Sequence, residues 1–169
     1  MARFRSFLLG VLITVVVLVV VGLVFTWAGL LDFRADQAPG PIETFFATHA
    51  VDSSISRHAP HIMSPLPATD ANLLDGMKFY TMNCAGCHGG VNKKESAFGR
   101  SFYPPAPQLI LNPLDDPEWR TFYAVKHGVR WTGMPAWEKT VGDDDLWKVT
   151  MFLTRVQKLP PAVQKAISQ

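Results

Sequence analysis

The stretch Cys84-Ala85-Gly86-Cys87-His88 holds the only two cysteines of this 169-residue chain and decides its fold. Two intervening residues in a tight turn point both thiols the same way. Two such thiols followed directly by a histidine are the pattern that attaches a c-type haem, through its two vinyl groups. The histidine then lies under the iron and binds it through an imidazole nitrogen. The pattern therefore predicts one covalent haem c on Cys84 and Cys87, with His88 as an axial iron ligand.

Two other kinds of site use a Cys-x-x-Cys pair, and the rest of the sequence disfavours both. A zinc ribbon needs a second cysteine pair, which this chain lacks. A thioredoxin-like dithiol needs a surrounding βαβ pattern, and the sequence shows no strand alternation of any length. With both thiols bonded to haem, no disulfide is left to form.

The second axial ligand of the iron is sought among the six methionines. Met134 stands between Gly133 and Pro135 in a predicted loop, and a loop methionine held by a proline can be presented to the open face of the iron. Met151 falls in the last predicted helix, where core packing is the ordinary role of a methionine. Met134 is the predicted sixth ligand, with a core position under the loop as the alternative. Ligation by histidine and methionine raises the reduction potential and leaves no open coordination site.

Residues 7–31 carry no charge and are long enough to cross a membrane. A helix that rises about 1.5 Å per residue over this segment spans the roughly 30 Å hydrocarbon core. Arg3 and Arg5 precede it, so the positive-inside rule predicts a cytoplasmic N-terminus and an exported remainder. A cleaved signal peptide is the alternative, but its apolar run is only about 7–15 residues long. We therefore predict a single-pass anchor over residues 1–31, with residues 7–31 in contact with lipid.

Residues 32–69 form a predicted connector outside the membrane. Pro41 can open a short helix. An apolar stripe at i, i+3, i+4 and i+7 then lines one face of it: Ile42, Phe45, Phe46 and His49. This face either packs on the domain that follows, or lies on the membrane surface or against a partner subunit. Farther on, His58 and His61 stand in a proline-rich strap, and nothing nearby completes a zinc ligand set. Both are predicted to be solvated or bonded to backbone.

Residues 70–159 are predicted to form a helical domain, and residues 160–169 a tail. Each of three helices has a start signal of capping or acidic residues, one of them with a proline at the first turn: Thr69 or Asp70, Asp116-Pro117-Glu118, and Asp143-Asp144-Asp145. The first helix runs into the cysteine motif, Gly128 stops the second, and the last ends before Pro160. The chain is thus predicted to be all-α.

From about residue 70 to 158 the chain resembles a class I cytochrome c domain. Three features carry the resemblance: the cysteine motif after a short helix, Gly133-Met134-Pro135-Ala136-Trp137 in the second loop, and an aromatic-rich closing helix. In that family the first and last helices cross at a glycine and aromatic residues, for which the candidates here are Gly76, Tyr80, Trp147 and Phe152. The resemblance implies the class I cytochrome c fold, all-α and wrapped around one covalent haem. It also places the methionine ligand at Met134.

The resemblance further implies which residues surround the haem. In similar domains a proline carbonyl after the motif accepts the proton on the second nitrogen of the axial histidine. Pro104 and Pro105 are the candidates, and Pro105 is preferred. The aromatic side chains expected to wall the haem or bond a propionate are Tyr103, Trp131 and Trp137. The basic side chains expected to neutralise propionates are Arg100, Lys126 and Arg130.

These features together predict electron transfer rather than catalysis. A net charge of +2 gives no support for a nucleic-acid partner, and no small-molecule substrate is expected. We predict a membrane-anchored mono-haem cytochrome whose haem domain lies on the periplasmic side. It would pass single electrons between redox proteins, as a tethered carrier or as a subunit of a membrane complex in a respiratory or other redox chain. A haem sensor with a displaceable sixth ligand is the alternative. A two-haem peroxidase would need a second haem motif, which the sequence lacks.

Overall fold

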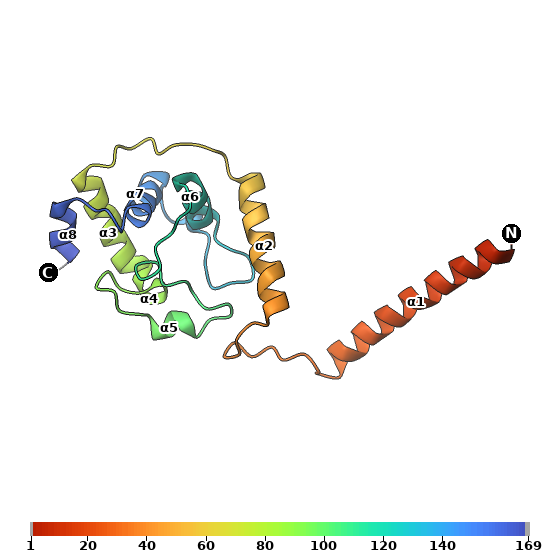
Figure 1. Cartoon of the computed structure of the whole chain (residues 1–169). Coiled ribbons are helices and arrows are strands. Elements are labelled where there is room, and N and C mark those ends of the chain that lie inside the picture. The colour runs from red at the N-terminus through yellow and green to blue at the C-terminus, as the bar shows by residue number, and fades with distance from the viewer. Residues whose placement is uncertain (1, 168–169) are drawn as a thin grey trace. The chain divides into compact units, whose positions relative to one another are not determined.

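The structure is a computed structural model and describes residues 2–167. All regular structure in this part of the chain is helical, as predicted (Figure 1). The helices are α1 (Ala2–Trp27), α2 (Pro41–His58), α3 (Asp70–Asn83), α4 (Ala85–His88), α5 (Ala97–Arg100), α6 (Glu118–His127), α7 (Asp143–Thr154) and α8 (Pro161–Ile167), with a 3-10 turn over Trp137–Lys139. The chain divides into two compact units, one ending at Arg34 and one beginning at Ala35, and each is described by itself.

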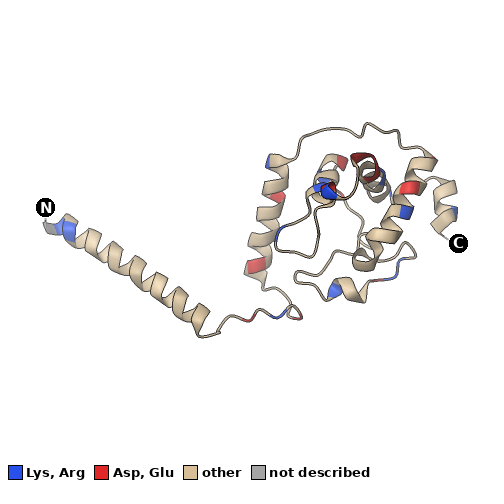
Figure 2. Cartoon of the chain, turned by 180° about the vertical axis from the view of Figure 1, so that it is seen from behind, with Lys and Arg blue, Asp and Glu red and all other residues tan. Residues whose placement is uncertain are grey.

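The first unit is the helix α1. Residues Arg3–Trp27 form a 25-residue stretch that is long and apolar enough to cross a membrane. Its charged residues lie at the N-terminal end only (Figure 2). The hydroxyls of Thr14 and Thr26 donate to the carbonyls of Gly10 and Gly22 one turn earlier. These polar groups are therefore satisfied within the helix, as a lipid environment requires. The helix fits a membrane anchor.

In the second unit, α3 and α7 cross at a glycine. A Cβ on Gly76 would lie 2.1 Å from the carbonyl oxygen of Lys148, so only glycine lets the two backbones approach this closely. Beside this contact, the rings of Tyr80 and Phe152 lie 5.8 Å apart. The expected crossing is confirmed at these residues. Trp147, expected at the same contact, stacks on Phe122 of α6 with ring centroids 3.8 Å apart.

The core of the second unit lies between α3, α6 and α7. Leu146, Val149 and Phe152 of α7 are fully buried, and Met151 is 1% exposed, which confirms the expected core role of that methionine. Removing a ring such as that of Phe152 costs about 3–5 kcal/mol. The predicted tail contains α8, whose Val163 is also fully buried. The end of the chain therefore adds to the core.

The helix α2 packs on the rest of the second unit, but through a different face from the predicted one. The apolar stripe faces solvent, since Ile42, Phe45 and Phe46 are 65–73% exposed. The contact with α6 is made instead by polar residues, because Arg120 of α6 pairs with Asp52 of α2. Of the predicted alternatives, packing of the stripe on the following domain is therefore wrong.

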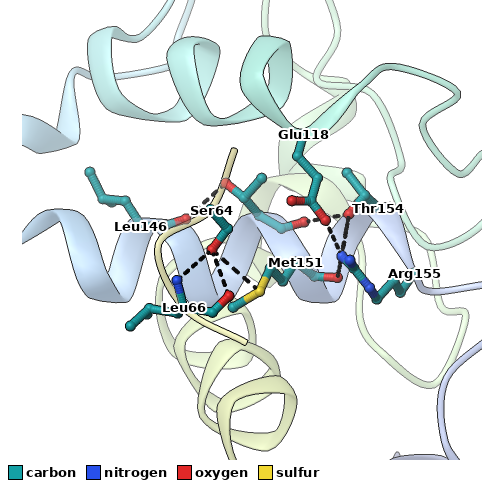
Figure 3. Close-up of polar contacts among 8 residues, drawn as sticks. Ser64, Leu66, Glu118, Leu146, Met151, Thr154 and Arg155 are labelled. Carbon is teal, nitrogen blue, oxygen red and sulfur yellow. Dashed lines mark hydrogen bonds and ion pairs between the residues drawn. The ribbon is translucent and has the colours of Figure 1, made fainter. Parts of the chain in front are cut away.

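The strap that joins α2 to α3 is tied along its length. Ala59 is buried, and the ring of His61 stacks on Trp119 with centroids 4.0 Å apart. Ser64 donates toward the sulfur of Met151 in α7, 3.6 Å away (Figure 3). Thr69 then caps α3 by accepting from the amide of Asn72, as predicted. The strap is thus part of the folded unit.

His58 and His61, two of the three histidines of the connector, act separately. Nδ1 of His58 lies 2.8 Å from the carbonyl oxygen of Ser54, a bond to backbone as predicted. His61 is held by its stack on Trp119. No group of three or more His, Cys, Asp or Glu side chains that could hold a metal ion is found within residues 2–167.

Candidate haem site

The cysteine motif forms a single helical turn at the end of α3. Cys84 is both the C-cap of α3 and the N-cap of α4. Its carbonyl accepts from the amides of Cys87, at 3.1 Å, and His88, at 2.9 Å. Gly89 ends the turn at a φ of +87°, a conformation that favours glycine. The two thiols stand at i and i+3, neighbouring positions on one face of a turn.

The turn is pinned to α3 from inside the core. The hydroxyl of Tyr80 lies 2.6 Å from the carbonyl oxygen of Gly89 and 3.0 Å from that of His88. Burial, and secondarily the nearby Cys84, raises the pKa of Tyr80, so the phenol remains a donor. Burial also raises the pKa of Cys84 to about 12, with a smaller contribution from Cys87. A sulfur in such surroundings is favoured uncharged, as it is in a thioether.

The imidazole of His88 is oriented by a proline carbonyl. Nδ1 lies 2.8 Å from the carbonyl oxygen of Pro107. A carbonyl can only accept, so Nδ1 carries the proton and the other ring nitrogen keeps its lone pair for a metal. The predicted partners, Pro104 and Pro105, are wrong. The amide of Leu109 donates to the carbonyl of His88 at 3.0 Å, and this bond sets the register of the loop so that Pro107 faces the ring.

A second layer of contacts holds the outer side of the turn. A Cβ on Gly99 of α5 would lie 1.8 Å from the carbonyl oxygen of Cys87, so α5 approaches the turn backbone to backbone. The buried Gln108 donates to the carbonyl of Cys87 at 3.1 Å and accepts from the amide of Ser96 at 2.7 Å. Sequence reasoning missed Gly99 and Gln108, because neither lies in a local pattern that marks it.

Met134 lies in a loop that closes back on the end of α6. Its carbonyl accepts from the amide of Val129 at 3.2 Å, and its amide donates to the hydroxyl of Thr132 at 3.1 Å. Gly128 has a φ of +66°, and a Cβ there would lie 2.7 Å from the carbonyl oxygen of Met134. The loop therefore depends on a glycine at the end of α6. The side chain of Met134 is half-buried.

Cys84, His88 and Met134 line one cavity. It encloses about 790 Å³ of space between atoms, a volume that includes solvent at its mouth. Most of the remaining lining is apolar: Ile55, Pro107, Leu109, Leu114, Ala124, Val125, Val129, Val149 and Leu153. Cys87, the second attachment cysteine, lies on the same α4 turn but outside the lining. An imidazole nitrogen and a thioether sulfur facing an apolar cavity, beside a turn that carries two thiols, are the donor types that a haem c needs. The residues present fit that group.

Thr121 and three charged side chains complete the lining: Asp52, Asp116 and Arg120. Arg120 is the only lysine or arginine among the lining residues that the structure describes, and its side chain is 17% exposed. Its guanidinium pairs with Asp116 at 2.8 Å and with Asp52 of α2 at 3.2 Å. Arg120 was not among the basic residues expected at the haem.

The aromatic residues expected around the haem lie outside this lining. Trp131 is 90% exposed. Trp137 packs edge-on against Phe79 with centroids 5.7 Å apart. The hydroxyl of Tyr103 donates to Glu43 at 2.5 Å, and this bond raises the pKa of the phenol. Each ring has a surface or inter-helix role in this structure, so the lining does not support the expectation that they wall the haem.

The expected basic residues and Pro105 lie outside the lining as well. Arg100 pairs with Glu95 at 3.2 Å, and Lys126 pairs with Asp143 at 2.8 Å. Arg130 lies over the ring of the exposed Trp131. Each of these three basic side chains is held by a partner outside the cavity lining. The resemblance alone did not show that Arg120 is the arginine in the lining.

Comparison with known proteins identifies this domain. Residues 71–153 match the family described as "Cytochrome C oxidase, cbb3-type, subunit III". No curated protein matches the chain. The helical fold and this match show a class I mono-haem cytochrome c domain, whose haem serves electron transfer. Within that class, the segment is similar to the cytochrome domain of the third subunit of cbb3-type oxidases. The match begins after α2 and the strap.

Proposed function

We propose that this protein is a membrane-anchored mono-haem cytochrome c that carries single electrons on the outer face of the membrane. The observation that carries the proposal is the convergence of Cys84, His88 and Met134 on one apolar cavity. Cys84 and Cys87 would hold the haem covalently, and His88 and Met134 would bind its iron from its two sides. The bound haem supplies the one-electron chemistry.

The protein's own residues favour a carrier over a catalyst. Pro107 holds the His88 ring in one tautomer and orientation, which keeps the ligand ready for the iron in both oxidation states. Met134 would occupy the sixth position, raise the reduction potential and leave no place for a small ligand. The rigid turn around residues 84–89 limits rearrangement when the charge on the iron changes. Fast exchange of single electrons follows from these properties.

The side of the membrane follows from the charges that flank α1. Arg3 and Arg5 precede the apolar stretch, whereas Asp32 and Arg34 follow it and pair with each other at 3.1 Å. The positive-inside rule therefore favours a cytoplasmic N-terminus and a haem domain on the opposite side. Covalent haem attachment takes place outside the cytoplasm, in agreement with this orientation.

The exposed stripe on α2 supports a place in a membrane complex. Ile42, Phe45 and Phe46 are exposed at the start of α2, and exposed apolar patches often mark protein–protein or membrane contacts. The similarity to an oxidase subunit favours a fixed subunit over a free tethered carrier. Purification from membranes in mild detergent tests this choice. Other redox subunits should travel with the wild-type protein but not with a Phe45→Ser/Phe46→Ser variant, and a solitary wild-type chain would favour the tethered carrier.

Spectroscopy tests the carrier function itself. We expect the reduced wild-type protein to be low-spin and not to bind carbon monoxide, because Met134 would occupy the sixth position. Ready binding of carbon monoxide by the wild type would replace this proposal with the haem sensor.

A further inference from the structure

The helix α2 lies outside the segment that matches the cytochrome family, yet it lines the same cavity as the haem ligands. Asp52 and Ile55 of α2 face this cavity together with Cys84, His88 and Met134. We infer that α2 is a wall of the haem site, which limits access of water and small molecules to the haem and thereby sets its reduction potential. The inference rests on the proposed function only in that the cavity holds haem.

A cluster centred on Arg120 holds α2 in place, and we call it the α2 latch: Arg120, Asp116, Asp52 and Ser56. Asp116 lies four residues before Arg120, just ahead of α6, and fixes the guanidinium from that side, with Nε to Oδ1 at 2.8 Å. The outer nitrogens then reach α2, where Nη2 lies 3.2 Å from Oδ1 of Asp52 and Nη1 donates to the hydroxyl of Ser56. Planar guanidinium groups suit such divided bonding.

Contacts on both sides of the α2 latch hold the ends of the helix. Near the N-terminal end, Glu43 accepts from the hydroxyl of Tyr103 at 2.5 Å. At the C-terminal end, Ala59 is buried, and His61 stacks on Trp119, the residue before Arg120. The helix is thus fixed at three places along its length. A flexible linker would make none of these contacts.

The wall has a definite electrochemical consequence. Oxidised haem carries one more positive charge than reduced haem, and water stabilises that charge. The shell around a metal site controls solvent access and therefore the reduction potential. Ile55 contributes apolar surface to the cavity, while the carboxylate of Asp52 is paired with Arg120. A closed α2 should therefore raise the potential, and an opened α2 should lower it and admit small reductants.

Two serines of α2 allow a matched test in the full-length holoprotein. Ser53 and Ser56 are both exposed, but of the two only Ser56 accepts from Arg120. Ser56→Ala and Ser53→Ala make the same chemical change and leave the net charge unaltered. Three quantities are measured for each variant and for the wild type: amide hydrogen exchange across residues 41–58, reduction potential, and the rate of reduction by ascorbate.

We expect Ser56→Ala to exchange amides in α2 severalfold faster, to have a lower potential and to react severalfold faster with ascorbate. Ser53→Ala should match the wild type. Asp52→Asn removes the ion pair and should speed amide exchange in α2 more than Ser56→Ala does. Its potential is not part of the comparison, because loss of a carboxylate from the cavity lining raises the potential by itself. Ile55→Ala leaves the α2 latch intact, so it should lower the potential without speeding amide exchange, which a purely structural role for α2 would not produce.

Two outcomes overturn the inference. Faster exchange in α2 with an unchanged potential and ascorbate rate would show that α2 does not shield the haem. Equal exchange in Ser56→Ala and Ser53→Ala, with no change in Asp52→Asn, would show that the α2 latch does not hold the helix. Neither outcome bears on the carrier function, which fails separately if the wild-type reduced protein binds carbon monoxide.

Discussion

The α4 turn and the helix α2 both face the candidate haem cavity, but contacts of different sequence range hold them there. Cys84 and His88 belong to one turn, and bonds within that turn hold them. Asp52 of α2 is held by Arg120, which lies 68 residues away in the sequence. The difference teaches that the two cysteines and His88 are encoded in a short motif, whereas Met134 and the helix α2 are brought to the cavity by contacts between distant parts of the chain. Four experiments can break or sharpen this contrast.

The largest effect is expected from the thiols. A Cys84→Ser/Cys87→Ser double variant should lose all covalent haem, because hydroxyls do not form the thioether bonds. Haem staining on a denaturing gel, with total haem measured by absorbance, checks this outcome. The control is Met82→Ala, a change at an exposed position of α3, the helix that ends at Cys84. This variant should keep its covalent haem. Haem that stays on the denatured double variant would refute the local encoding of attachment.

The next effect concerns the sixth ligand. Met134→Ala should lower the reduction potential strongly and allow the reduced protein to bind carbon monoxide, because it opens the iron on that side. Met63→Ala is the matched control, since Met63 is 89% exposed in the strap, and it should leave both properties unchanged. Potentiometric titration and carbon monoxide difference spectra measure the result. An unchanged reduction potential in Met134→Ala would contradict iron ligation by Met134 and favour a packing role for this residue.

A smaller effect is expected where α5 meets the turn. Gly99→Ala would place a Cβ 1.8 Å from the carbonyl oxygen of Cys87, and overpacking of this kind costs about 1–3 kcal/mol or more. Gly142 is the N-cap of α7, and a Cβ added there would have no atom within 4 Å. Gly142→Ala should therefore cost only the loss of a favourable N-cap residue, about 1 kcal/mol or less. Denaturant unfolding followed by circular dichroism compares the two. Equal stability would mean that the turn does not depend on α5.

The smallest effect is expected from the stack that ends α2. His61→Ala removes a ring that lies 4.0 Å from Trp119, and we expect a loss of about 1 kcal/mol, typical of aromatic pairs. His49→Ala removes a stack on Phe45 at 6.0 Å that lies within α2, and should change stability less. Chemical unfolding and amide exchange in residues 41–69 provide the measurement. A larger loss in His49→Ala would show that the exposed stripe of α2 contributes more to stability than the contact between the strap and Trp119.

The helices of the domain were predicted well where a local signal starts or stops them. The Thr69 cap, the start at Asp143 and the stop at Gly128 stand in the structure as expected. The proline of Asp116-Pro117-Glu118 became the N-cap, and α6 begins one residue later. The helix α7 ends at Thr154, before Pro160 as expected. By contrast, α5 and α8 were not anticipated. Helices of one or two turns are too short for a 3.6-residue periodicity to show.

The candidate site was predictable in its ligands but not in its surroundings. The motif and the loop methionine are recognisable because their residue types and spacing are themselves the chemistry. Pro107 could not be told from Pro104 and Pro105, since all three lie in one loop and a distant bond from Leu109 to His88 sets the register. Arg120 resembles an ordinary surface arginine in the sequence. Only the fold brings Asp52 to it.

The face of α2 gives the clearest failure of pattern reasoning. The hydrophobic stripe of Ile42, Phe45 and Phe46 predicted correctly that a helix forms after Pro41. It did not predict which side packs, because the packed side carries Asp52 and Ser56, residues typical of a solvated face. Hydrophobic periodicity shows which face of a helix is apolar, but it cannot show that a polar face packs through an ion pair with another helix.

The position of α2 in the chain also sets an order of assembly. Synthesis proceeds from the N-terminus, so α2 and the Cys84–His88 turn exist before Tyr103 and Arg120, the residues that hold α2. Until those residues are made, α2 cannot form its contacts with Tyr103 and Arg120, although the two thiols are already present. Most of the cavity lining, from Pro107 to Leu153, is also made after His88, so the cavity takes shape only when the later helices have formed. Covalent attachment of haem can therefore begin before α2 is fixed in place.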